Sequence, residues 1–152
     1  MIIRKATLAD LSQIKNLYRE LFKKAADLQP KYYKEADAGD YPKETIESEN
    51  SEIFVSIIDD KATGLISVHR KKSEPWDCIV QLEFANVAEL VVCENYRKQG
   101  IATALLNHVK NWAKLQNLHH LQLNALANNS NAINLYENYG FKSANLTYRL
   151  KI

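Results

Sequence analysis

A short basic turn between an apolar stretch and a helical pattern is the segment of this sequence best suited to chemistry. It follows Leu90–Val92, carries Arg97 and Lys98, and reaches Gly100 just where a helix is expected to start. The first amides of a helix have no internal partner and carry partial positive charge, and glycine lets a ligand approach the backbone closely. The turn therefore predicts a phosphate or pyrophosphate site. An ordinary strand-to-helix turn with solvated basic side chains is the alternative for so short a motif.

Two other phosphate-binding patterns are absent from the sequence. It has no Gly-x-x-x-x-Gly-Lys-Ser/Thr run, which argues against a P-loop NTPase, and no Gly-x-Gly-x-x-Gly run. With only 4 glycines in the chain, a dinucleotide-binding fold is poorly supported.

A second pattern lies nearer the C-terminus. Asn129 and Tyr136 are two helical turns apart, and Gly140 and Phe141 follow them. At this spacing the asparagine and the tyrosine can share one face of a helix. The alternative is that Tyr136 is a core aromatic packed near Leu135 and Phe141.

Together the two patterns resemble the signatures of the GNAT superfamily of N-acetyltransferases. The run Arg97–Ala102 is similar to the Arg/Gln-x-x-Gly-x-Gly/Ala signature, and Asn129–Phe141 is similar to the second motif of the family. The resemblance covers about residues 85 to 141. It implies an enzyme that moves acetyl from acetyl-CoA to a primary amine of a small molecule or peptide, by direct attack in a ternary complex. A non-catalytic module that binds or senses acyl-CoA on the same fold is the alternative.

The resemblance also implies roles for individual residues. The amides of the basic turn hold the CoA pyrophosphate, the strand before it pairs with the pantetheine arm, and Asn129 contacts CoA. Tyr136 lies near the thioester sulfur and protonates the departing thiolate. The expected CoA-binding residues are Leu90, Val91, Val92, Arg97, Lys98, Gln99, Gly100, Ile101, Ala102, Thr103 and Asn129. No metal is expected, because the histidines show no metal-ligand spacing.

The reaction also needs a base, because an alkylammonium must lose a proton before its nitrogen attacks a thioester. Glu89 is the leading candidate, since it is a carboxylate within the otherwise apolar stretch 87–92. Glu83 is the second choice. An outward-facing residue or a structural ion pair is the alternative role for Glu89. Cys93 has no marked histidine partner and is expected to be an inert, small apolar side chain.

The segment Gln29–Asn50 is acidic and rich in tyrosine. It holds six carboxylates, three lysines and three tyrosines. With the loop around Trp76, it is expected to border the acceptor cleft, where aromatic walls and negative charge suit a cationic amine. A solvated loop accounts for the same composition equally well.

Hydrophobic periodicity predicts the elements that position these residues. Strands are expected at residues 2–6, 53–58, 62–69, 85–92 and 120–126, with two more short strands within 141–151, and helices at 8–25, about 42–49, from about 100, and 129–139. This order predicts an α/β (α+β) fold with a central mixed, mostly antiparallel sheet and helices on both faces. A single domain over residues 1–152 is expected for a chain of this length.

Composition and charge limit the kinds of binding partner and the cellular compartment expected for this protein. A net charge of +2 without a basic stripe argues against nucleic acid. No apolar run approaches the ~20 residues of a membrane helix, and the N-terminus resembles a strand, not a signal peptide. The two cysteines form no disulfide framework, so a cytoplasmic protein is expected. A homodimer is expected from the habit of the family and from short terminal strands with open edges.

Overall fold

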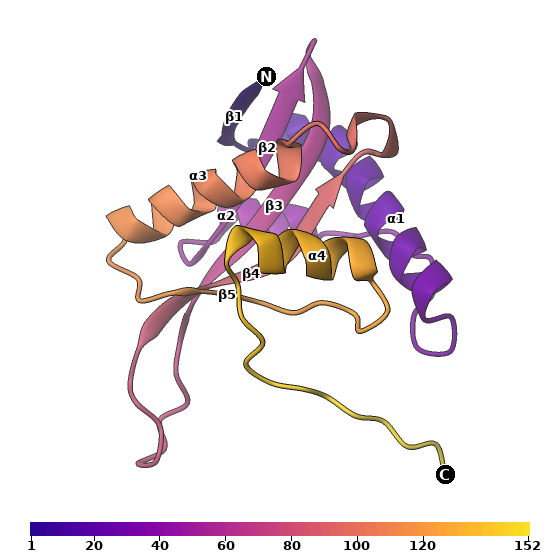
Figure 1. The fold of residues 1–152 in the computed structure, drawn as a ribbon. Coiled ribbons are helices and arrows are strands. Elements are labelled where there is room, and N and C mark those ends of the chain that lie inside the picture. Colours follow the sequence, from indigo (N-terminus) through magenta and orange to yellow (C-terminus); the bar gives the residue numbers. More distant parts are fainter.

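A five-stranded sheet in the order β1-β2-β3-β4-β5 organises the computed structural model, which describes residues 1–152 (Figure 1). The strands are β1 (Ile2–Lys5), β2 (Ser51–Ile58), β3 (Lys61–Lys72), β4 (Glu83–Val92) and β5 (Leu121–Leu123). The helices are α1 (Leu11–Leu28), α2 (Tyr41–Glu47), α3 (Ile101–Leu115) and α4 (Ser130–Tyr139), with 3-10 turns η1 (Leu8–Asp10) and η2 (Glu94–Tyr96). Strands β1 to β4 are antiparallel neighbours and β5 is parallel to β4. The predicted mixed, mostly antiparallel sheet is confirmed.

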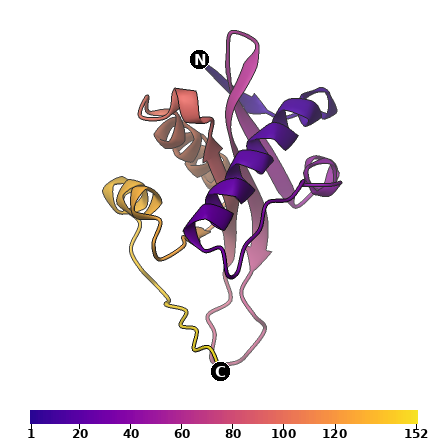
Figure 2. The ribbon, with the colours of Figure 1, turned by 90° about the vertical axis from the view of Figure 1, so that its right-hand side faces the viewer.

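Helices cover both faces of this sheet (Figure 2). Alternate residues of β2 and β3 supply two separate cores: Phe54 and Ile66 pack with α3, whereas Ile53 and Leu65 pack with α1. Because side chains alternate between the faces of a strand, a strand buried on both faces is apolar almost throughout. This explains why the middle parts of the two strands are mostly apolar, with Ser56 and Ser67 as buried polar exceptions.

Three residues fix the start of α1 against β1. Nη1 and Nη2 of Arg4 each donate to the Asp10 carboxylate at 2.8 Å, and the backbone amide of Thr7 donates to the same carboxylate at 2.8 Å. The Asp10 side chain is only 8% exposed. The hydrogen bonds from Arg4, more than any other contact, lower the pKa of Asp10 from its usual 3.8 to about 2.

Asp10→Asn is expected to lower the free energy of unfolding by about 2 kcal/mol at neutral pH, because a depressed carboxyl pKa stabilises the fold wherever the group is ionised. This stabilisation is complete above the unfolded pKa near 3.8 and is lost as the pH falls to the folded pKa of about 2. Urea unfolding across that window should show the difference between parent and variant closing. Asp27→Asn, which removes an exposed i,i+4 partner of Lys23, should change stability far less. A difference that does not vary with pH would contradict the assignment.

The sheet opens between β4 and β5. Their parallel pairing covers only Ala85↔Leu121, Asn86↔Gln122 and Val87↔Leu123. After this paired stretch, β4 contains a β-bulge. Ser67 of β3 pairs with Glu89 and Val68 pairs with Val87, so Ala88 has no partner in β3. From residue 88 to 92, β4 is therefore paired with β3 alone, and its other edge is free.

The C-terminal region differs from the sequence prediction. The two short strands expected within residues 141–151 were predicted wrongly: residues 142–152 form no strand and make no backbone hydrogen bond. This C-terminal arm, residues 142–152, extends away from the body of the molecule (Figure 1). Strand β5 is also shorter than the expected 120–126. A strand needs a hydrogen-bonded neighbour, and no other strand of this chain lies alongside the outer edge of β5. Neither the C-terminal residues nor an extension of β5 is therefore held as a strand there.

The remaining elements follow the prediction closely. The expected helix at 8–25 is η1 followed by α1, which continues to Leu28, and α2 begins at Tyr41. No helix has the length and apolar character that crossing a membrane would require.

Candidate functional site

A cavity of about 150 Å³ lies where the sheet opens. Its walls come from α1, from β4 at the bulge, from the segment that follows β5, and from α4. It brings together four residues predicted for the site, Glu89, Leu90, Asn129 and Tyr136. The other lining residues are Leu21, Lys24, Ala25, Leu28, Val87, Ala88, Leu123, Asn124, Ala125, Leu126 and Ala132.

The cavity joins the two faces of the sheet. Glu89 points to the α1 face, where it meets Tyr18 of α1. Tyr136 packs against the core on the opposite face, beside α3. Because β4 and β5 separate after Val87 and Leu123, no ladder closes the space between them. A molecule on one face can therefore meet a molecule on the other through this gap.

Two tyrosine hydroxyls hold the Glu89 carboxylate. Tyr18 donates to Oε2 at 3.1 Å, and Tyr41 donates to Oε1 at 3.1 Å and lies 3.3 Å from Oε2. The Tyr41 hydroxyl also lies 3.1 Å from Nε2 of His69. A hydroxyl has only one proton to donate. Because Tyr41 donates its proton to Glu89, the hydrogen bond between Tyr41 and His69 must be donated by Nε2 of His69.

Burial keeps these neighbours in fixed protonation states. It raises the pKa of Tyr18, which is fully buried, and of Tyr41, so both hydroxyls remain donors. It lowers the pKa of His69. The carboxylate of Glu89 is therefore oriented by two neutral hydroxyl donors.

The basic turn has the features expected of a phosphate site. The six amides of residues 98–103 make no backbone hydrogen bond, and the first amide bonded within α3 is that of Ala104. Lys98 and Gly100 have φ of 60° and 79°, in the left-handed region. Nothing lies within 4 Å of where a Cβ of Gly100 would be. An anion can therefore approach the free amides and the start of α3.

Arg97 has a partner in the fold. Its Nε donates to the carbonyl oxygen of Val92 at 3.0 Å, and its Nη2 lies 3.9 Å from Glu20. The guanidinium thus ties the turn to the end of β4 and leaves the free amides as the main donors to an anion.

Tyr136 is both a packed aromatic and a wall of the cavity. Its ring meets Phe141 edge to face with 5.8 Å between centroids. Burial alone raises the pKa of its hydroxyl, with no hydrogen bond contributing. The hydroxyl therefore keeps its proton at neutral pH and has it free to donate. The packing of Tyr136 as a core aromatic is confirmed, whereas its role near the thioester sulfur stays a prediction.

Asn129 has a structural role that the sequence reasoning missed. Its Oδ1 accepts from the amide of Ala132 at 3.3 Å and so caps α4. Nδ2 of its amide remains available at the cavity wall. An asparagine just before an apolar helical pattern is itself a capping signal.

Two other predicted features, the second-choice base and the loop around Trp76, lie outside the cavity. Glu83 pairs with Arg70 at 2.6 Å and Lys72 at 3.3 Å. Trp76 is 63% exposed and does not line the cavity. The structure therefore does not bring the second-choice base or the loop around Trp76 to this site.

Cys93 is half-buried, and burial raises the pKa of its thiol. A raised pKa disfavours the thiolate, as expected for an inert side chain. No group of three or more His, Cys, Asp or Glu side chains is arranged to hold a metal ion.

Of the acidic segment, only Tyr41 is placed beside Glu89. Asp37 pairs instead with Arg19 at 2.5 Å, and Glu35 lies 3.9 Å from Lys23. These contacts dock the segment against α1. They also neutralise part of its negative charge.

The profile of the acetyltransferase (GNAT) family matches residues 11–141. The chain belongs to the acetyltransferase (GNAT) family. The match spans the basic turn, the gap between β4 and β5, and α4. The resemblance predicted from the sequence is confirmed, whereas the roles of single residues remain predictions.

Individual proteins of known sequence or structure agree with this membership. Streptothricin acetyltransferase from Escherichia coli is 28% identical over 102 residues, which cover 67% of this chain and 53% of that protein. This chain thus spans about half the length of the curated relatives that it matches.

Solved structures show the same GNAT fold. A tetramutant of the BH1408 protein from Bacillus halodurans superposes with a TM-score of 0.94 at 18% identity and covers 100% of both chains. Aminoglycoside N-acetyltransferase AAC(6')-Iy, in complex with CoA, superposes with a TM-score of 0.75 at 16% identity, over 99% of this chain and 100% of that chain.

Proposed function

We propose that residues 1–152 form one N-acetyltransferase domain that moves acetyl from acetyl-CoA to a primary amine of a small molecule or peptide by direct attack in a ternary complex. The observation that carries the proposal is the cavity at the gap between β4 and β5, which Glu89 and Tyr136 both line. A carboxylate and a protonated phenol at one gap are what an amine attack and a thiolate departure require. A non-catalytic acyl-CoA module needs neither.

In this proposal, backbone groups of the chain make most of the contacts that bind CoA. The amides of residues 98–103 bind the pyrophosphate, and the free edge of β4 from Leu90 to Val92 pairs with the pantetheine arm as an added strand. CoA supplies an activated acetyl thioester. Asn129 offers Nδ2 from the other wall of the cavity.

Glu89 takes the proton of the acceptor ammonium, directly or through water, while Tyr18 and Tyr41 hold its carboxylate in place. Tyr136 donates its hydroxyl proton to the departing sulfur. Most of the rate comes from holding the amine and the thioester together. No covalent acyl-enzyme forms, which agrees with the raised pKa of Cys93.

The acceptor proposed is a cationic amine. A carboxylate flanked by two aromatic rings attracts an ammonium group, and Glu89 has Tyr18 and Tyr41 beside it. The relatives support this class, since their names give streptothricin and aminoglycosides as acceptors.

An acetyl-CoA consumption assay against polyamines, aminoglycosides, streptothricin and lysine peptides tests the function. Turnover that depends on one class of amine is expected. CoA binding without turnover on any of these amines would favour the non-catalytic alternative.

CoA and acetyl-CoA are expected to raise the melting temperature by mass action, whereas NAD and ATP should do much less. The reason is that the free β4 edge adds a contact for pantetheine that the other two ligands lack. Differential scanning fluorimetry at matched concentrations measures the effect, and equal shifts from all ligands would contradict specific CoA binding.

Gly100→Val is expected to weaken CoA binding by at least about 10-fold, because a β-branched residue strains a positive φ and fills the approach to the amides. Isothermal titration with CoA measures the change. Gly39→Val is the matched control: Gly39 has a φ of +58° and open space around it, as Gly100 does, but lies outside the turn. A folded Gly100→Val protein with parental affinity would remove the phosphate-site assignment.

We also propose a homodimer in the cytoplasm, with no nucleic acid or membrane partner. Both cysteines are free thiols, which supports a reducing compartment. The free edge of β5 and the exposed C-terminal arm support self-association.

A further inference from the structure

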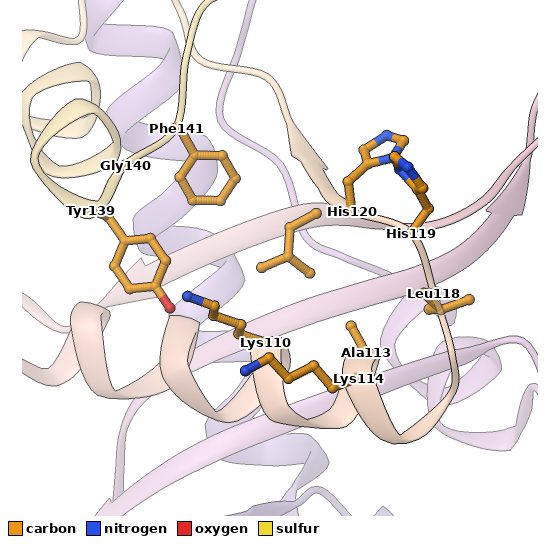
Figure 3. Close-up of a pocket in the computed structure, with 10 residues that line it drawn as sticks. Lys110, Ala113, Lys114, Leu118, His119, His120, Tyr139, Gly140 and Phe141 are labelled. Atoms are coloured by element: carbon orange, nitrogen blue, oxygen red, sulfur yellow. The ribbon is translucent and has the colours of Figure 1, made fainter. Parts of the chain in front are cut away.

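The cavity between β4 and β5 contains a cation as well as an anion. Among its lining residues only Lys24 and Glu89 are charged. A larger hollow, of about 280 Å³ beside α3, differs in this respect, because Lys110 and Lys114 line it and no carboxylate does (Figure 3). The cavity at the gap can therefore meet both signs of charge on one ligand, whereas the mechanism proposed above uses only its glutamate.

Lys24 has no anionic partner within the chain. It is half-buried, and it takes part in none of the ion pairs of the structure. Its neighbour Lys23, by contrast, donates to Asp27 at 2.8 Å and lies 3.9 Å from Glu35. An ammonium group is a donor only and carries a full charge, so Lys24 is free to bind an anion brought by a ligand.

The helix α1 directs Lys24 toward the group that holds Glu89. The six residues from Tyr18 to Lys24 rise about 9 Å along the helix, and the Tyr18 hydroxyl donates to Glu89. Helical side chains are tilted toward the N-terminus of their helix, which is the direction from Lys24 to Tyr18. Four residues of α1 at the i, i+3, i+4 and i+7 spacing of one helix face line the cavity: Leu21, Lys24, Ala25 and Leu28.

We propose that the acceptor carries an anionic group as well as its amine, and that Lys24 binds this anion while Glu89 receives the ammonium. Opposite charges at two places in one cavity fix both the position and the direction of such a ligand. The apolar side chains of Leu21 and Ala25 suit the short hydrocarbon segment that joins its two charged groups. The class of acceptor is an ω-amino carboxylate, either free or as one end of a larger molecule.

This proposal rests on the acetyl transfer proposed above and narrows its acceptor. Polyamines and aminoglycosides carry several ammonium groups, and a second ammonium near Lys24 meets a like charge. An acceptor with one ammonium and one carboxylate is therefore preferred over a polycation. Lys24 is a specificity-determining residue in this scheme, whereas Glu89 acts on the proton.

Steady-state kinetics on the full chain test the proposal with straight-chain ω-amino acids, from β-alanine to aminohexanoate, each compared with its carboxamide. The carboxamide keeps the amine and the chain length and removes the negative charge. For the best chain length, kcat/KM of the acid should exceed that of the carboxamide by about 10-fold, the lower end for a hydrogen bond to a charged group. The difference should lie in KM, because Lys24 binds the ligand away from the reacting atoms.

Lys24→Met keeps much of the length of the side chain and removes its charge, so it should lower the acid-to-carboxamide ratio to about one. Lys24→Glu should shift the preference toward diamines. Lys23→Met is the matched control, because Lys23 is the next residue on α1 but pairs with Asp27 and lies outside the cavity. It should keep the parental ratio. The same acceptors are compared in every variant, so differences in amine pKa cancel.

Isothermal titration of the acids and carboxamides into protein saturated with CoA separates this proposal from acetyl transfer. Binding that depends on the carboxylate and on Lys24, without turnover, would keep the Lys24 site and remove the transferase function. Turnover with the same acid-to-carboxamide ratio in parent and Lys24→Met would keep the function and overturn the Lys24 site. A parent that acetylates polycations better than every amino acid would also overturn it. So would a Lys24→Met protein that loses CoA affinity at an unchanged ratio, because Lys24 would then bind the cofactor.

Discussion

Tyr136→Phe is expected to lower kcat by about 10- to 100-fold, with little change in fold or in acetyl-CoA affinity. Losing a positioned general acid costs roughly 100- to 10,000-fold, and the expected loss lies at or below the bottom of that range because a thiolate leaves without a proton more easily than an alkoxide does. The variant keeps the ring that packs on Phe141 and removes only the hydroxyl. Steady-state kinetics, with chemistry shown to be rate-limiting, measure the effect.

Tyr139→Phe is the matched control for this variant. Tyr139 lies on the same helix, and its hydroxyl donates to Asn107 at 2.8 Å, outside the cavity. This variant should keep parental turnover. If Tyr136→Phe also keeps it while well folded, Tyr136 is a structural aromatic and the general-acid role is wrong.

Glu89→Gln is expected to lower kcat/KM by about 100-fold or more when the acceptor amine is protonated, the scale of losing a positioned base. An alkylamine has a pKa near 10.4, so the amine needs a base at neutral pH and progressively less help as the pH rises. The deficit of the variant should therefore shrink toward high pH. The glutamine still offers an oxygen to Tyr18 or Tyr41, so the pocket keeps its shape.

The pH–rate profiles of parent, Glu89→Gln and Glu83→Gln decide this prediction. Glu83 is on the same strand but pairs with Arg70 and Lys72, so Glu83→Gln should follow the parent. A Glu89→Gln profile parallel to the parent at all pH values would show that another group or bulk water takes the proton.

Local patterns predicted most of the elements and the chemistry-bearing residues. The basic turn and Glu89 were singled out from residue type and position, because helix starts and strand patterns depend on neighbouring residues, whereas the role expected of Tyr136 came from the resemblance to the GNAT family. The capping role of Asn129 carried a local signal that the resemblance to a CoA contact obscured. Glu83 and Glu89 lie on one strand, and only their partners distinguish them: Glu83 pairs with Arg70 and Lys72, whereas Glu89 accepts from two tyrosines.

The network around Glu89 was beyond the reach of sequence reasoning. The hydrogen bond from Tyr18 to Glu89 joins residues 71 positions apart, and that from Tyr41 joins residues 48 apart. Which hydroxyl meets a carboxylate depends on how α1 and α2 pack on the sheet. No local pattern contains that information.

The sequence by itself determined that apolar and polar residues alternate in the C-terminal arm and that a basic turn precedes a helix, because both follow from the order of adjacent residues. Only the tertiary structure decided that the cavity opens where β4 leaves β5, and that the C-terminal arm has no partner in its own chain. The physical reason is the same in both cases. A strand is stabilised by hydrogen bonds to a neighbour distant in sequence, so its pattern shows what it can bury but not which edge it joins.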